Sequence, residues 1–172
     1  LRAITQLHEV FARNLTHSLG AYLRVVFDVN LVSVEQLGYN EFLARLPERT
    51  YLATTQLQPV NATSALQLDL ALAFPIIDLL LGGFGTPEAE LRDITDIEEQ
   101  ILEGVVRVIC RELEAAWQPL GISCSFEQRQ QPAQMQRLMP PNEKTLSLSF
   151  EIRMPESRGM LNLVCPSSVS NI

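Results

Sequence analysis

The chain has 172 residues, of which 47% are hydrophobic and 19% are charged, so it can bury a core and is too apolar to be disordered. Its net charge of −7 argues against nucleic-acid binding, which needs clustered Lys and Arg side chains to displace counterions. We therefore expect a globular protein without a nucleic-acid partner.

The cysteines and histidines form no metal-binding or disulfide pattern. Cys110, Cys124 and Cys165 are widely spaced and include no CxxC pair, so we expect buried free thiols. His8 and His17 lie on one predicted helix without an HExxH pattern and are expected at surface or boundary positions. We expect neither a metal ion nor a cofactor.

The first half of the chain predicts a long helix, three strands, a short helix after the first strand, and a final helix. Residues 3–22 carry apolar side chains at helical spacing. β-branched residues predict a strand over 24–37, a short helix follows over 39–45, and residues 50–58 and 64–70 predict two further strands. Asp69 is expected to cap a helix over 70–81, in which Pro75 predicts a late start or a kink. The buried stripe of the first helix is expected to comprise Ile4, Leu7, Phe11, Leu15, Leu19 and Tyr22.

The most apolar window, residues 65–85, does not predict a membrane span. It contains Asp69, Pro75 and Asp78, and each Asp at the bilayer centre would cost about 2.5–3.5 kcal/mol. No signal-peptide pattern opens the chain. Because the sequence starts at Leu1 without Met, we expect it to be part of a longer protein.

The second half opens with the strongest helix signal in the sequence. Thr95 and Glu98 have the spacing of a capping box, and Pro119-Leu120-Gly121 is expected to end the helix. Strands are predicted over residues 122–130, 144–154 and 159–165, and Pro166 opens another helix start. The apolar stripe of the long helix is expected to comprise Ile97, Ile101, Leu102, Val105, Val106, Ile109, Leu113 and Trp117. Its solvated face is expected to carry Glu99, Glu103, Arg107 and Glu114.

The two halves, about residues 3–81 and 95–172, share one order of elements. Each has a long helix, then strands, then a helix start, which suggests a duplicated αβββα unit. Strands grouped between helices favour an α+β protein or a layered α/β/α sandwich over a doubly wound parallel sheet. Of these we expect the α/β class, as a three-layer α/β/α sandwich with pseudo-twofold symmetry. We expect one domain over residues 1–172.

The apolar helix of residues 70–81 ends at a glycine cluster that allows several interpretations. A phosphate loop is excluded because the glycines follow a helix instead of a strand and no Lys is near. Gly82 can be the helix cap, with the rest a flexible turn. Gly83, Phe84 and Gly85 exceed what a cap needs, and an exposed Phe in a permissive backbone suits contact with a protein. Arg92 and Asp93, further along the connection, fit solvated loop charges or the rim of an interface.

The chain resembles the middle domain of the FliM family of flagellar motor switch proteins through essentially its whole length. The segments that carry the resemblance, in order, are "LHEVFARNL", "DVNLVSVEQLGYNEFLARLP", "LALAFPIIDLLLGGFG", "ITDIEEQIL" with "LEAAW", "PPNEKTLSLSFEI" and "GMLNLVCP". The most specific piece is an aliphatic helix that closes on a GGxG motif, although Pro75 departs from the family pattern. The resemblance implies the fold of the CheC-type phosphatases.

The resemblance also implies a function without catalysis. It implies a cytoplasmic structural subunit of the C-ring, peripheral to the inner membrane, that binds FliG and neighbouring FliM subunits and helps to set the direction of rotation. FliN and phosphorylated CheY would bind through parts of the full-length protein outside these 172 residues. The loop expected to contact FliG comprises Gly82, Gly83, Phe84, Gly85, Thr86 and Pro87.

The alternative function is that of a CheC-type phosphatase acting on phosphorylated CheY. The site of those enzymes resembles an E-x-x-N pattern on the long helix. Here Glu9 is followed by Ala12, and Glu103 by Val106, so neither half carries the Asn. Neither Ala nor Val can orient an attacking water by hydrogen bonding, which argues against catalysis.

Overall fold

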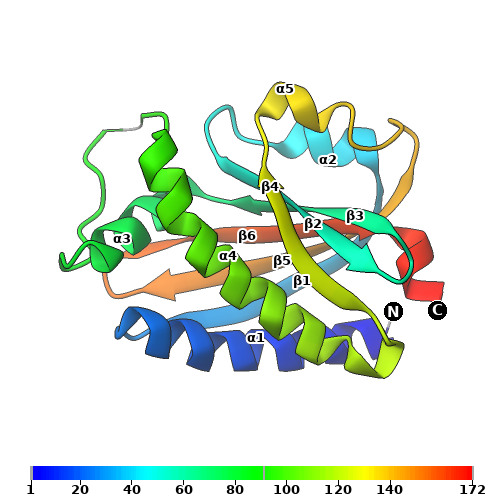
Figure 1. Ribbon diagram of the computed structural model, residues 1–172, viewed down its shortest axis with the longest axis horizontal. Coiled ribbons are helices and arrows are strands. Elements are labelled where there is room, and N and C mark those ends of the chain that lie inside the picture. The colour runs from blue at the N-terminus through cyan, green and yellow to red at the C-terminus, as the bar shows by residue number, and fades with distance from the viewer. Residues whose placement is uncertain (1, 91, 172) are drawn as a thin grey trace.

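A single antiparallel sheet with helices on both faces forms the molecule, as a computed structural model of residues 2–90 and 92–171 shows (Figure 1). The six strands lie in the order β1-β5-β6-β3-β2-β4. Their bounds are β1 (Asp28–Gly38), β2 (Tyr51–Gln58), β3 (Ala62–Leu68), β4 (Ser123–Arg129), β5 (Lys144–Met154) and β6 (Ser157–Pro166). The predicted three-layer α/β/α class is confirmed.

Three helices cover one face of the sheet and two short ones lie on the other (Figure 1). The first group is α1 (Arg2–Leu23), α3 (Leu70–Leu80) and α4 (Asp96–Ala116). The second group is α2 (Tyr39–Arg45) and α5 (Pro132–Met135). The 3-10 helices η1 (Gln118–Leu120) and η2 (Ser167–Asn171) follow α4 and β6. None of the helices in this described part of the chain combines the length and apolarity that crossing a bilayer takes.

The strand order is symmetric under exchange of the two halves. If the labels β1, β2 and β3 are exchanged with β4, β5 and β6, the strand order becomes the same order read from the opposite edge of the sheet. The symmetry centre lies between β3 and β6, where Ala65 pairs with Val164 and Leu68 with Leu161. The halves are interleaved, because β1 pairs with β5 and β4 pairs with β2. The outer strands therefore tie each half to the other.

The larger core lies between the sheet and the layer of α1, α3 and α4. As the alternation in residues 144–154 predicts, Leu146, Leu148, Phe150 and Ile152 are all buried on one face of β5. The ring of Phe150 meets that of Phe11 from α1 edge to face, with 5.2 Å between the centroids. A smaller core fills the other face, beneath α2 and α5.

Several predicted exposures are wrong, each for a local reason. His8 is buried because both ring nitrogens are satisfied: Nδ1 donates to the Ile4 carbonyl (2.8 Å) and Nε2 accepts from Trp117 Nε1 (3.0 Å). Tyr22 is partly exposed, with its hydroxyl lying against Gly104 where α1 meets α4. The three cysteines are buried and free, as expected.

The first turn of α4 reverses two further predictions. Ile97 is 71% exposed, whereas Glu99 is buried. Residues two apart point to opposite sides of a helix, so Ile97 and Glu99 cannot both face the sheet. Glu99 faces β4, where its carboxylate pairs with the guanidinium of Arg129. Burial raises the pKa of Glu99 in spite of that partner. The capping box of Thr95 and Glu98 is confirmed.

The start of α3 also differs from the prediction. Asp69 occupies the N-cap position, but its carboxylate accepts from the backbone N–H of Met160 and from the Gln67 amide, both at 2.8 Å. It therefore joins α3 to β6 instead of capping the helix. The helix does not begin late, since it starts at Leu70 and runs through Pro75. The first strand begins later than predicted, at Asp28, after a turn in which Arg24 has a positive φ of 55°.

Candidate protein-binding site

The loop that follows α3 begins with an ordered helix end. The N–H of Gly82 donates to the Leu79 carbonyl (3.1 Å) and the N–H of Gly83 to the Asp78 carbonyl (2.8 Å). These two bonds, with Gly82 at φ +96°, make a Schellman motif, in which glycine avoids the cost of a left-handed conformation. The prediction that Gly82 caps the helix is confirmed.

The carboxylate of Asp78 organises the next turn of the loop. Its Oδ2 accepts from the N–H of Gly85 at 2.9 Å and from that of Thr86 at 3.1 Å. The segment from Gly82 to Thr86 is thus held by hydrogen bonds at both ends, in place of the flexible turn that the sequence left open. Sequence reasoning missed Asp78, although an isolated acid in the apolar run "IIDLLL" was an available signal.

Two of the glycines lie where a side chain would collide with the last turn of α3. A Cβ at Gly83 would come within 2.4 Å of the Asp78 carboxylate. A Cβ at Gly85 would lie 3.2 Å from Leu79 Cγ, and φ there is +81°, a conformation that L side chains rarely adopt. The glycines therefore allow the loop to fold closely against α3.

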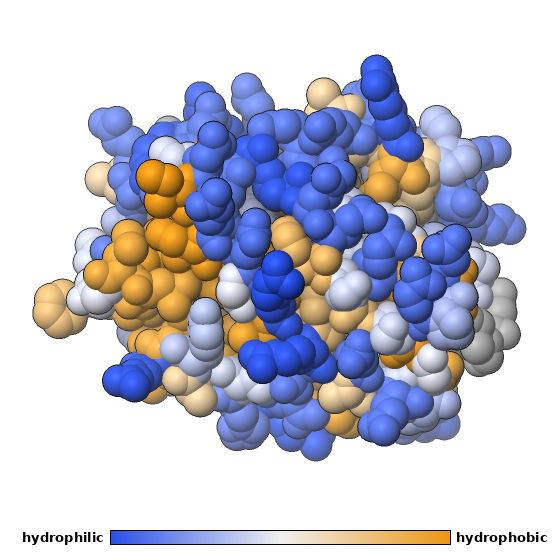
Figure 2. All heavy atoms as spheres, viewed as in Figure 1, coloured by the Kyte–Doolittle hydropathy of each residue, from blue (hydrophilic) through white to orange (hydrophobic). Residues whose placement is uncertain are grey.

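An apolar surface projects from this end of the molecule. Phe84 is 93% exposed and Leu81 is 69% exposed, whereas Gly85 between Phe84 and Thr86 is buried. Figure 2 shows apolar side chains gathered on the left of the molecule, over α3 and the connection that follows it. Thr86 and Pro87 continue the exposed face of the loop. Such an exposed aromatic residue on an ordered backbone is typical of a contact with another protein.

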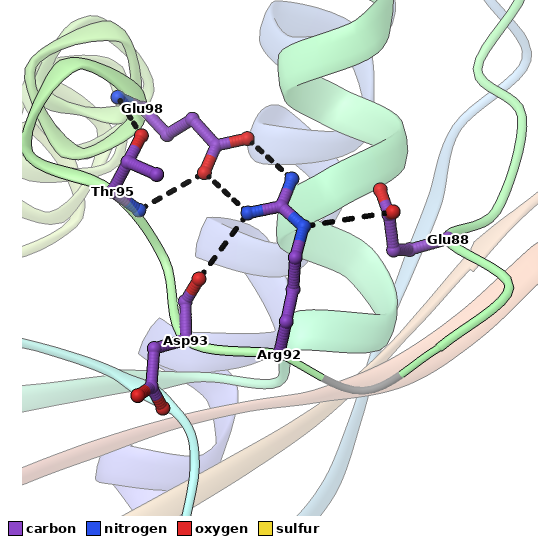
Figure 3. Close-up of polar contacts among 5 residues, drawn as sticks. All are labelled: Glu88, Arg92, Asp93, Thr95 and Glu98. Atoms are coloured by element: carbon purple, nitrogen blue, oxygen red, sulfur yellow. Dashed lines mark hydrogen bonds and ion pairs between the residues drawn. The ribbon is translucent and has the colours of Figure 1, made fainter.

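Arg92 anchors the far end of the same connection, as Figure 3 shows. Its guanidinium makes paired bonds to the Glu98 carboxylate, at 2.8 and 2.7 Å, and an ion pair with Glu88 at 3.5 Å. It also donates to the carbonyl of Asp93 at 3.2 Å. Arg92 is therefore a structural link and not a solvated loop charge, whereas Asp93 is exposed and pairs with Arg49.

Glu98 binds both Arg92 and the backbone at the start of α4. Its carboxylate binds Arg92 and also accepts from the backbone N–H of Thr95 at 2.9 Å, within the capping box. These bonds, chiefly those from Arg92, lower the pKa of Glu98 from 4.5 to about 2. The same pairing raises the pKa of Arg92. The charges hold the connection in place before α4 begins.

A groove of about 430 Å³ lies beside the loop. Its lining includes the apolar residues Leu70, Ala71 and Phe74 of α3 and Pro87 of the connection, followed by Glu88 and Glu90. Glu156 and Arg158, from the turn between β5 and β6, border it on the other side. The groove adjoins the loop at Pro87.

The two positions where the phosphatase pattern requires Asn are buried in this structure. Ala12 of α1 and Val106 of α4 are 4% and 1% exposed. In the described structure, both helices therefore lack a polar side chain at the position where the phosphatase pattern requires Asn.

Comparison with known structures identifies the fold. The chemotaxis protein CheX from Desulfovibrio desulfuricans superposes with a TM-score of 0.57 at 9% identity, covering 93% of this chain and 99% of that chain. At that identity the likeness concerns the fold alone. The three-layer architecture is thus that of the CheC- and CheX-like proteins.

Sequence comparison narrows the class to a family. The model of the family described as "Flagellar motor switch protein FliM" matches residues 1–171. The FliM protein of Treponema pallidum is 34% identical over 167 residues, which are 96% of this chain and 48% of that protein. The chain belongs to the FliM family of flagellar motor switch proteins, and it spans about half the length of the relatives it matches.

Two solved FliM structures have the same fold along nearly the whole chain. A chain of the FliG–FliM complex from H. pylori superposes with a TM-score of 0.94 at 30% identity, covering 99% of this chain and 97% of that one. The FliM middle domain from H. pylori gives a TM-score of 0.89 at 28% identity, with coverage of 99% and 97%. The predicted resemblance to the FliM middle domain is confirmed.

Proposed function

We propose that this chain is the FliG-binding part of a flagellar motor switch subunit and that it binds through the loop of residues 82–87. The observation that carries the proposal is the 93% exposed ring of Phe84, held between two glycines whose backbone is ordered by hydrogen bonds. The similarity to a FliM chain crystallised with FliG supports the choice of partner.

The physics of the loop suits docking. The exposed Gly82 lets a partner approach the backbone closely, and Pro87 limits the freedom of the chain that follows. Burying a phenylalanine ring is worth about 1.5–3 kcal/mol, which suits Phe84 as the apolar anchor. Because the loop is already ordered, docking costs less conformational entropy.

The remaining roles follow from the family. We place the chain in the cytoplasmic C-ring, at the inner membrane but not inserted, where it packs against neighbouring FliM subunits and FliG. Switching of rotation would be a shift between alternative packings of these subunits. The role is structural, and the buried Ala12 and Val106 support a function without catalysis.

Substitution of the loop glycines tests the proposal. A pull-down of FliG from the same organism with Gly83→Arg and Gly85→Arg variants should recover little FliG, whereas the unchanged chain retains it. Circular dichroism and thermal unfolding would establish that the variants are folded. Undiminished FliG binding by folded variants would overturn the proposal.

The phosphatase alternative has its own assay. The chain is mixed with phosphorylated CheY, and the loss of phosphate is compared with the spontaneous rate. We expect no acceleration. A clear acceleration would show catalysis by groups other than the E-x-x-N pattern.

A further inference from the structure

One side chain, Asp78, controls the shape of the loop. Four backbone N–H groups donate to this residue: those of Leu81 and Gly83 to its carbonyl, and those of Gly85 and Thr86 to Oδ2 of its carboxylate. The bonds to the carboxylate are charge-assisted and so stronger than neutral ones. They fix the backbone on the C-terminal side of Phe84, while the Schellman bonds fix it on the other side.

Asp78 occupies a position that is unfavourable for the helix itself. It lies in the last turn of α3, three residues before the C-cap residue Leu81. Asp has a low helix propensity, and its negative charge is repelled by the negative end of the helix dipole. The surrounding residues Ile76, Ile77, Leu79 and Leu80 are all apolar. Asp78 is thus unfavourable for the stability of α3, and its hydrogen bonds to the loop offset this cost.

We propose that Asp78 is a positioning residue that holds the loop of residues 82–87 in one conformation and thereby strengthens binding of the partner. The second part rests on the proposed function, namely that this loop contacts FliG. Without the carboxylate, the N–H groups of Gly85 and Thr86 lose their acceptor and Phe84 samples many orientations. Docking must then order the loop, which costs affinity.

The requirement for glycine at residue 83 follows from the same contact. A Cβ at Gly83 would lie 2.4 to 2.5 Å from the Asp78 carboxylate. The three nearest atoms of the described residues all belong to that carboxylate. Gly83→Ala should therefore force the carboxylate away from Gly85 and Thr86. In an Asp78→Ala background the same substitution should be nearly harmless, since the colliding group is gone.

Amide hydrogen exchange tests the proposal without any partner. In Asp78→Ala the amides of Gly85 and Thr86 should exchange about tenfold faster or more, because their acceptor is lost. The Gly83 amide should stay protected, since it bonds to a backbone carbonyl. Asp78→Asn should keep most of the protection, because its amide oxygen can still accept both bonds.

FliG titrations on the same variants test the consequence. We expect Asp78→Ala to weaken FliG binding about five- to tenfold and Asp78→Asn less than threefold. Glu48→Ala, which removes the same charge from an exposed site between α2 and β2 and outside the groove, should leave the affinity unchanged. Gly83→Ala should weaken binding in the unchanged background and have little further effect beside Asp78→Ala.

The outcomes separate the inference from the function on which it rests. Unchanged exchange at Gly85 and Thr86 in Asp78→Ala would overturn the positioning role, whatever FliG does. Faster exchange with unchanged affinity, in a chain whose Phe84→Ser variant does lose FliG, would overturn the link between loop order and binding. If Phe84→Ser also keeps full affinity, the proposed function fails, and faster exchange still supports Asp78 as the residue that orders the loop.

Discussion

The guanidinium carbon of Arg92 lies 4.3 Å from the ring centroid of Phe74 and joins the end of the loop connection to the middle of α3. This cation–π contact is reinforced by the paired bonds from Arg92 to Glu98 at the start of α4. Asp78 holds the other end of the connection. The exposed Phe84 is therefore presented between two anchored segments, as expected of a preformed binding element.

Arg92 should be sensitive even to a conservative change. Lysine keeps the charge but cannot form the paired bonds to Glu98 or stack as a planar group on Phe74. We expect the urea midpoint of unfolding to fall in the order unchanged chain, Arg92→Lys, Arg92→Ala. The control is Arg45→Ala, which breaks an exposed ion pair with Glu35 and should have little effect. Equal stability of Arg92→Lys and the unchanged chain would refute the role of the paired geometry.

The stabilisation by Glu98 should depend on pH in a defined direction. The pKa of Glu98 falls from 4.5 to about 2 on folding, so its contribution is fully present above about pH 4.5 and is lost as the pH falls towards 2. Glu98→Gln should cost about 1 kcal/mol near neutral pH. Urea titrations should show the difference between the two proteins shrinking as the pH drops from about 5 to 3. A difference independent of pH would contradict this assignment.

His8 predicts a separate pH dependence near neutrality. Burial lowers its pKa from 6.5, and its Nε2 must stay unprotonated to accept from Trp117. As the pH falls, His8 is therefore protonated in the unfolded chain before it is protonated in the folded protein. Stability is lost as the pH falls from about 6.5 towards the folded pKa. His8→Gln offers an oxygen near the position of Nε2 and should lack this loss. Unfolding followed by Trp117 fluorescence would decide, and the same pH dependence in both proteins would rule out His8 as its cause.

Gly85 and Gly121 both have a left-handed backbone conformation, with φ of +81° and +70°, and can be compared. Alanine at either should cost about 1–2 kcal/mol of stability through backbone strain. Gly121 follows η1, and a Cβ there would meet nothing within 4 Å, whereas one at Gly85 would contact Leu79. We expect Gly85→Ala to weaken FliG binding and Gly121→Ala to leave it intact at equal protein concentration. Equal loss of binding in both would assign the effect to general destabilisation.

The order of elements was predictable because hydrophobic periodicity reports it directly. The long helices, the short helix of residues 39–45 and the strand of residues 144–154 follow from local pattern and agree with α1, α4, α2 and β5. The interleaved pairing of β1 with β5 and of β4 with β2 did not follow, because pairing between distant strands leaves no local pattern. Symmetry of the two halves was the available hint.

The sequence marks the candidate loop, but it does not show what orders that loop. Three glycines and a Phe at the end of a helix mark the loop without further information. The roles of Asp78 and Arg92 depend on where a carboxylate and a guanidinium point, which periodicity does not tell. His8 and Glu99 were misplaced for the same reason, since burial of a polar group depends on the partners Trp117 and Arg129 from distant segments.

The most direct test is the affinity of the chain for FliG with Phe84 replaced. Isothermal titration of purified FliG should show binding weakened about tenfold or more by Phe84→Ser. Val32→Ser, which replaces an apolar residue 59% exposed in the edge strand β1, should bind as the unchanged chain does. Since the Phe84 ring is almost wholly exposed, its removal should not lower stability. Full affinity of a folded Phe84→Ser variant would contradict the claim that this loop holds FliG.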